Sequence, residues 1–269
     1  MKRCLIFIFL ILCSKIYASQ VTDGLIAYYQ FNGDASSSIQ DSYGNNDGSF
    51  IGSPTNPYTE DNFKESLLLN GTNQYFRVED NLNLDFSTAL TIICWVKPTT
   101  LSSGRAFVSK WTSGDGQNRN YGISDYNGAV SADINTNING VNTLYLNSAL
   151  AANIWQQVAM TYDAASQTLT AYLNNSAYSF STSSTVQGSL YNGNSPLLVG
   201  ALLPAGWYYS GYIDEVKLFN RALSSPEILQ EYDYVVNELG TVSNQVPEPL
   251  TLSLLVSACC GIFLRKLSS

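Results

Sequence analysis

Short segments rich in strand-forming residues recur throughout residues 21–239, and clusters of Gly, Asn, Ser and Asp separate them. Segments of this length with β-branched and aromatic residues are typical of β-strands, and the clusters between them are typical of turns. In residues 168–173, apolar Leu169, Ala171 and Leu173 alternate with more polar side chains, so one face of that strand should be solvated. The pattern predicts an all-β domain in which two antiparallel sheets pack face to face.

Helical features are confined to the segment LSSPEILQEYDYVVNEL near the end of this region. Ser224 precedes Glu227 by three residues, which is the spacing of a capping box, and Pro226 suits a first helical turn. We therefore expect one short helix to close the domain. The chain has 269 residues, 45% of them apolar, which is enough for one core, so we expect a single domain.

The predicted strands are eleven segments, which in chain order are GLIAYYQF, SLLLNG, QYFRVE, LTIICWVKP, RAFVSKW, NYGISDY, AVSADIN, WQQVAMTYD, QTLTAYLNN, PLLVGAL and YIDEVKLFN. Each is of strand length, and each carries β-branched or aromatic residues.

The first 19 residues have the three parts of a secretory signal peptide. Lys2 and Arg3 give a basic start, an apolar run follows over residues 4–13, and small Ala18 and Ser19 mark the expected cleavage region. The alternatives are a buried strand or an uncleaved anchor, but a membrane span needs about 20 apolar residues and this run is shorter. The chain is therefore predicted to be exported.

Cysteine positions argue against internal disulfides. Cys4 and Cys13 leave with the signal peptide, and Cys259 and Cys260 lie in the C-terminal tail. The folded part keeps Cys94 alone, within an apolar strand segment, so a buried small hydrophobe is expected rather than a reactive thiol.

The C-terminal tail combines a proline motif, an apolar run and a basic end. Residues 250–264 carry no charge, and as a helix they would extend about 22 Å, against a hydrocarbon core of about 30 Å. Pro247 and Pro249 hold the preceding chain extended, and Arg265 and Lys266 favour the cytoplasmic side. The tail is predicted to contact the membrane through this helix before any processing.

This tail resembles the PEP-CTERM sorting signal of Gram-negative bacteria. The motif residues are Val246, Pro247, Glu248 and Pro249. The resemblance implies that residues 246–269 are recognised and removed by an exosortase, a membrane transpeptidase-like enzyme, after residues 240–245 have served as a linker. It also implies export across an inner membrane and a final place in the cell envelope or outside the cell. An ordinary C-terminal anchor is the alternative.

The order of the strand segments resembles the laminin G-like, concanavalin A-like jelly-roll family. The matching pieces are GLIAYYQFNGDASSSIQDSYGNNDGSFIG, SLLLNGTNQYFRV, LTIICWVKP, IWQQVAMTYDAASQTLTAYLNN and GYIDEVKLFNRALSSPEI. Gln156 and Gln157 stand where relatives often have His, and LNN ending at Asn175 replaces a frequent Asp-Gly turn. The resemblance implies a two-sheet jelly-roll sandwich over residues 21–239.

Enzymatic alternatives are restricted by the residues. The chain has no His, which excludes Ser-His and Cys-His nucleophilic catalysis and His-ligated zinc on this chain alone. Enzymes of this architecture carry Glu-x-Asp-x-Glu on one strand, and no such run occurs. Asp214 and Glu215 are adjacent, so they should point to opposite strand faces. A hydrolase or lyase with carboxylates from different strands remains the alternative function.

The family resemblance also implies a structural calcium ion. Its expected ligands are Asp34, the Gly71 carbonyl and Asp214, all oxygen ligands of the kind that Ca²⁺ prefers. In the alternative interpretation Asp34 caps a turn and Asp214 accepts backbone hydrogen bonds.

Aromatic residues beside Gly-rich loops are the candidate ligand contacts, because Trp and Tyr rings pack on sugar faces. Trp95 and Trp155 lie inside strand segments and are expected in the core. The candidate ligand residues are Trp111, Tyr126, Trp207 and Tyr208.

The net charge of the chain restricts the classes of partner that it can bind. Residues 20–249 hold eight basic and twenty-one acidic residues, a net charge of −13, which repels nucleic acid and favours neutral glycans or proteins. The prediction is an exported, non-enzymatic binding or structural protein whose partner is an extracellular glycan or matrix protein. A surface protein that binds only copies of itself is a further alternative.

Overall fold

The computed structural model describes residues 18–32, 38–52, 58–61, 64–101, 104–112, 118–174 and 178–239. Most of the predicted signal peptide, the linker 240–245 and the sorting segment 246–269 lie outside the described residues, so the predictions about them stay predictions. Among the described residues, no helix is long and apolar enough to cross a membrane.

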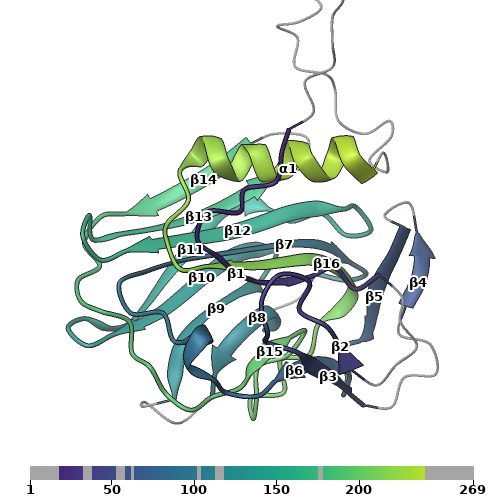
Figure 1. The fold of residues 1–269 in the computed structure, drawn as a ribbon, viewed down its shortest axis with the longest axis horizontal. Helices are drawn as coiled ribbons and strands as arrows, with labels where there is room; N and C mark the ends of the chain where they lie inside the picture. Colours follow the sequence, from purple (N-terminus) through teal and green to yellow (C-terminus); the bar gives the residue numbers. More distant parts are fainter. Residues whose placement is uncertain are drawn as a thin grey trace, which may run out of the picture.

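Two antiparallel sheets, each of eight strands in the described part of the chain, face one another as a sandwich (Figure 1). Sheet A has the order β14 (Tyr178–Ser183), β13 (Thr168–Asn174), β12 (Gln156–Asp163), β7 (Ala89–Pro98), β16 (Ser210–Phe219), β5 (Lys64–Asn70) and β4 (Tyr58–Asp61), with β1 (Leu25–Tyr29) also paired to β16. Sheet B has the order β11 (Gly140–Ala149), β10 (Ala129–Thr136), β9 (Arg119–Tyr126), β8 (Arg105–Trp111), β15 (Leu197–Val199), β6 (Tyr75–Val78), β3 (Gly48–Ile51) and β2 (Ser38–Ile39). The predicted all-β, two-sheet sandwich is confirmed.

The core between the sheets is formed by alternate residues of each strand. On β7 these are Ile92, Cys94 and Val96, and on β10 they include Val130 and Ile134, all buried. The cysteine is free and buried, as its apolar segment predicted. Because strand side chains alternate, the residues between these core positions point to the outer faces of the two sheets.

The α-helix of the described residues, α1 (Ser225–Leu239), lies on the outer face of sheet A (Figure 1), and a short 3-10 helix, η1 (Leu82–Leu84), follows β6. Helix α1 was predicted from the capping-box spacing, and the Glu227 carboxylate accepts a 2.8 Å hydrogen bond from the backbone N–H of Ser224. Tyr232 of the helix stacks on Trp95 with ring centroids 5.2 Å apart, and Trp155 packs in the same cluster. Both tryptophans are buried as expected, but beneath the helix rather than between the sheets.

Five strands were not among the predicted segments: β2, β3, β4, β11 and β14. Four of them are the outermost strands of the two sheets, at β14, β4, β11 and β2. An edge strand is solvated along one side and carries fewer apolar residues, so its sequence gives a weaker strand pattern.

A buried charge cluster connects β1, β16 and α1. The Lys217 ammonium lies 2.6 Å from a carboxylate oxygen of Glu231 and 3.7 Å from one of Glu215. The other Glu231 oxygen accepts a 2.5 Å hydrogen bond from the backbone N–H of Val21. Lys217 also lies 4.4 Å above the Tyr28 ring, and Tyr28 donates its hydroxyl to Glu215. The cluster therefore holds the start of the domain, its last strand and its helix together.

Candidate functional site

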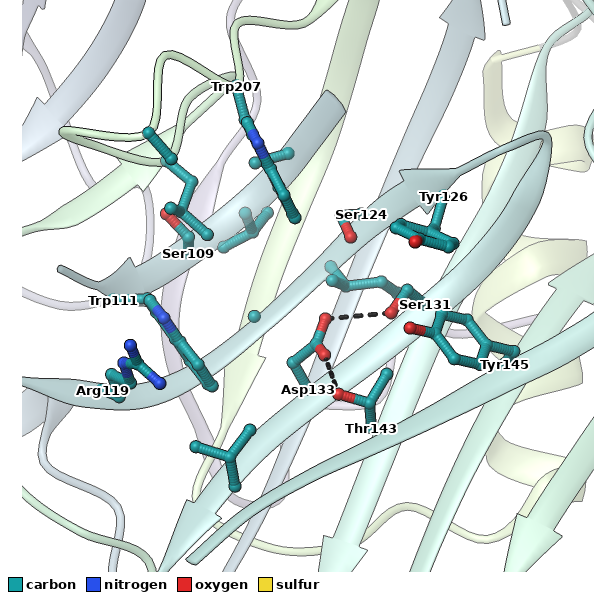
Figure 2. Close-up of a pocket in the computed structure, with 17 residues that line it drawn as sticks. Ser109, Trp111, Arg119, Ser124, Tyr126, Ser131, Asp133, Thr143, Tyr145 and Trp207 are labelled. Atoms are coloured by element: carbon teal, nitrogen blue, oxygen red, sulfur yellow. Dashed lines mark hydrogen bonds between the residues drawn. The ribbon is translucent and has the colours of Figure 1, made fainter. Parts of the chain in front are cut away.

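The outer face of sheet B carries a pocket of about 230 Å³ (Figure 2). The face is set by alternation along β10, where Val130, Ala132 and Ile134 enter the core while Ser131 and Asp133 point outward. Residues paired across neighbouring strands lie on the same face of the sheet. Asp133 is opposite Thr143 on β11 and Gly122 on β9, so these positions share the outer face. Gly122 places no side chain over the floor, which leaves room beside Asp133.

Four aromatic side chains form the pocket walls. Trp111 comes from the end of β8, Tyr126 from the end of β9 and Tyr145 from β11, while Trp207 comes from the loop before β16. Figure 2 shows them surrounding the pocket from different sides. The Tyr126 and Tyr145 rings contact each other, with centroids 5.2 Å apart. Both remain partly exposed, at 38% and 43%, so their faces are accessible to a ligand.

The loop before β16 fixes the position of Trp207. Its backbone N–H donates to the Leu202 carbonyl at 3.3 Å, and its carbonyl accepts from the Leu202 N–H at 3.2 Å. Gly104 lies against the indole, and a Cβ at that position would be 2.9 Å from Nε1. Because Gly104 has a φ of +77°, glycine suits both the backbone and the close ring contact.

Asp133 is the carboxylate of the pocket floor. One of its oxygens accepts a 2.6 Å hydrogen bond from the Thr143 hydroxyl, and the other accepts a 3.0 Å bond from the Ser131 hydroxyl. Burial raises the pKa of Asp133 above its usual value, and these two hydrogen bonds oppose part of that rise. An ionised carboxylate has about four acceptor positions, so about two remain for a ligand.

Two further polar groups of the pocket lack partners among the described residues. Within the described ranges, the Ser124 hydroxyl and the Arg119 Nε are buried and form no hydrogen bond. The Arg119 guanidinium lies 5.7 Å from the centre of the Trp111 ring. Buried polar groups are normally hydrogen-bonded, so these unpaired atoms indicate binding capacity for a ligand.

Three of the four candidate ligand residues line this one pocket: Trp111, Tyr126 and Trp207. Tyr208 does not line it. Its ring lies 6.2 Å from that of Tyr75, and its carbonyl accepts a 2.7 Å hydrogen bond from Arg105. Trp207 lies at the centre of a tight turn, in which the Tyr208 N–H donates a 3.0 Å hydrogen bond to the Gly206 carbonyl.

The structure does not bring the predicted calcium ligands together. Asp34 lies outside the described residues. Ser210 pairs with Asn70 and Ile213 with Leu67, so Asp214 lies about five residues, or about 16 Å, along the strands from Gly71. Calcium ligands lie about 2.3–2.6 Å from the ion, so Gly71 and Asp214 do not fit one site.

Both groups have other partners. The Gly71 carbonyl accepts a 3.5 Å hydrogen bond from the Arg105 guanidinium, and Asp214 accepts a 2.8 Å bond from the N–H of Glu215. The described residues contain no group of three or more acidic, Cys or His side chains that could hold a metal ion.

Several pocket residues were missed by sequence reasoning, namely Arg119, Ser124, Ser131, Asp133, Thr143 and Tyr145. The segment AVSADIN was predicted as a strand, and its alternation already placed Ser131 and Asp133 on the face opposite Val130 and Ala132. The segment containing Thr143 and Tyr145 was not predicted as a strand. Their place beside Asp133 depends on the pairing of β10 with β11.

Comparison with known families identifies the fold. A family model of the concanavalin A-like lectin/glucanases superfamily matches residues 70–229, which is more than half of the chain. The chain therefore belongs to this superfamily, as its segment order indicated. A comparison with curated protein sequences gave no significant match.

Solved structures share the fold at low sequence identity. Domain 4 of AbnA, a GH43 extracellular arabinanase from Geobacillus stearothermophilus, solved in complex with arabinotriose, has a TM-score of 0.57 and 21% identity, covering 76% of this chain and 96% of that domain. The binding domain of Paraclostridial Mosquitocidal Protein 1 has a TM-score of 0.58 and 18% identity, covering 78% and 52%. The ligand-binding domain of botulinum neurotoxin serotype D, solved with N-acetylneuraminic acid, has a TM-score of 0.58 and 14% identity, covering 79% and 50%. This chain thus spans about half the length of the two toxin domains.

Proposed function

We propose that this chain is an exported, non-enzymatic glycan-binding domain of the cell envelope or extracellular matrix, and that the pocket on sheet B is its ligand site. The observation that carries the proposal is the placement of Trp111, Trp207, Tyr126 and Tyr145 around the Asp133 carboxylate. Aromatic rings provide flat apolar contact for the C–H face of a sugar. Carboxylate and hydroxyl groups at the floor provide hydrogen bonds for sugar hydroxyls.

Binding is favoured over glycoside hydrolysis by the composition of the pocket. Hydrolysis of this kind uses two carboxyl groups about 5–9.5 Å apart, one of which protonates the leaving oxygen. Among the described residues that line the pocket, Asp133 alone carries a carboxyl group. The similar solved structures named above are binding domains or a domain solved with a bound oligosaccharide, which fits the same proposal.

Trp207→Ala tests the site. We expect it to weaken retention on polysaccharide from the producing cells by about tenfold to a hundredfold, because the lost aromatic contact is worth about 1.5–3 kcal/mol. The measurement is affinity electrophoresis or titration with the mature chain. Tyr43→Ala is the matched control, since Tyr43 is 51% exposed and does not line the pocket. Equal retention of the Trp207 variant and the unmodified protein would exclude this pocket as the site.

We further propose that the tail is a removable sorting signal read by an exosortase. Support comes from the order of the Pro-Glu-Pro motif, the apolar run and the basic end. Replacing Pro247, Glu248 and Pro249 by Ala should leave the tail attached and the protein in the inner membrane. Intact mass and cell fractionation of the native and variant proteins check this. A native protein that keeps the tail and stays in the membrane would show that the tail is an anchor.

A further inference from the structure

Within the described part of the chain, no cation pairs with Asp133. Its two carboxylate oxygens accept hydrogen bonds from the neutral hydroxyls of Thr143 and Ser131, and among the described residues no ammonium or guanidinium group forms an ion pair with it. The Arg119 guanidinium of the same pocket lies over the Trp111 ring instead. In the view of Figure 2, that ring lies between Arg119 and Asp133. The floor of the pocket is therefore an unneutralised acidic position.

Aromatic rings lie around this acidic position in the view of Figure 2. Figure 2 shows the Asp133 carboxylate between Trp111 on one side and the Tyr126 and Tyr145 rings on the other, with Trp207 nearby. The negative face of an aromatic ring attracts a cation, most strongly for Trp and where water is excluded. A partly buried carboxylate such as that of Asp133 is less costly when a cation pairs with it. The rings and the carboxylate thus favour the same kind of ligand group, which is a positively charged one.

We propose that the pocket selects glycans whose bound sugar carries a protonated amino group, with the ammonium at Asp133 and the sugar ring against the indoles of Trp111 and Trp207. This inference rests on the proposed glycan-binding function and specifies its ligand class. The ammonium would donate hydrogen bonds to the free acceptor positions of Asp133, and the net charge of −13 over residues 20–249 would attract a cationic glycan at long range.

The polar groups of the pocket favour an amino sugar over the methylated amine of a protein side chain. Among the described residues, the buried Ser124 hydroxyl of the pocket has no hydrogen-bond partner, and a sugar offers a hydroxyl group to it. A trimethylated lysine would contact the rings and the carboxylate but leave the Ser124 hydroxyl unpaired. The substituents of the sugar then determine how tightly it binds. Acetylation of the amine removes the charge, and a carboxylate on the sugar would be repelled by Asp133.

Titration calorimetry with the mature chain tests the inference. We expect the trimer of glucosamine to bind at least about tenfold more tightly than the trimer of N-acetylglucosamine, and trigalacturonate to bind more weakly than either. Asp133→Asn should abolish the preference for the free amine while keeping the thermal stability of the domain. Glu79→Gln is the control for overall charge, because Glu79 is 78% exposed, pairs with Arg77 and lies outside the pocket.

The possible outcomes separate this inference from the proposed function. If neutral trimers bind as tightly as the glucosamine trimer, and Trp207→Ala abolishes both, the pocket is a glycan site but its selection of amines is refuted. If the Asp133→Asn variant keeps the preference, the ammonium position is wrong. If a trimethyl-lysine peptide binds more tightly than the glucosamine trimer, the amine ligand is a protein and the inference fails. If no glycan binds in a manner sensitive to Trp207→Ala, the proposed function itself fails.

Discussion

Lys217→Met should lower the free energy of unfolding by about 3–5 kcal/mol at neutral pH. Lys217 is 1% exposed, and its ammonium is the cation that faces the buried carboxylates of Glu231 and Glu215. Removing one partner of a buried ion pair leaves an uncompensated charge, which costs far more than the loss of an exposed pair. For a domain of this size the midpoint of thermal unfolding should fall by on the order of 10 °C.

The loss should depend on pH in a defined direction. Burial raises the pKa of Glu215 even in the presence of Lys217, whose positive charge lowers it. Without Lys217 the folded-state pKa of Glu215 rises further above its unfolded value of about 4.3. A carboxyl group with a raised folded-state pKa destabilises the protein at pH values above its unfolded pKa, and this penalty disappears as the pH falls. The difference in the free energy of unfolding between the Lys217→Met variant and the unmodified protein should therefore become smaller as the pH falls from 7 to 4.5.

Urea unfolding monitored by Trp fluorescence measures both effects. Arg77→Met is the matched control, because its ion pair with Glu79 is exposed and such pairs contribute about 0–1 kcal/mol. Adding Glu231→Gln to Lys217→Met should restore part of the stability, since one uncompensated carboxylate is removed. A loss below about 1 kcal/mol for Lys217→Met, or a loss independent of pH, would contradict a central role for this cluster.

The fold could be predicted from the sequence because the patterns that indicate its strands, turns and helix each involve residues close together in the chain. Strand segments, turn clusters and the Ser224–Glu227 spacing each depend on neighbouring residues, and the two sheets and α1 follow from them. The edge strands β11 and β14 were missed because their solvated sides carry polar residues. The predicted class of protein rested on the order of these segments, and the match over residues 70–229 supports it.

The candidate site could be predicted only in part, because its residues meet through strand pairing. Trp111 and Trp207 were selected for lying beside Gly-rich loops and Tyr126 as their neighbour, and loops of this kind often carry binding residues. Asp133 was missed because its significance comes from Thr143 across the strand pair and from the rings around it. The calcium prediction depended on residues far apart in sequence, and the register of β5 with β16 separates Gly71 from Asp214.

Lys110→Met should reduce the free energy of unfolding by about 3–5 kcal/mol and should also weaken ligand binding in the pocket. The Lys110 side chain is fully buried, and its ammonium lies 2.6 Å from Asp80, 3.0 Å from Asp85 and 2.8 Å from the Gly193 carbonyl. It thereby joins β8 to the chain after β6 and to the loop before β15. Trp111 is the next residue on β8, so loosening this end of the strand displaces a wall of the pocket.

Replacing a single acidic partner should cost less than replacing Lys110. Asp80→Asn leaves the ammonium with Asp85 and the Gly193 carbonyl, and Asp80 is 31% exposed, so water can replace part of its contact. Lys110→Met instead leaves two carboxylates and a carbonyl without their shared cation. The expected order of destabilisation is Lys110→Met well above Asp80→Asn, measured by urea unfolding with an unchanged slope. Equal losses would show that the Asp80 pair alone matters, and unchanged glycan affinity in Lys110→Met would separate the anchor of β8 from the position of Trp111.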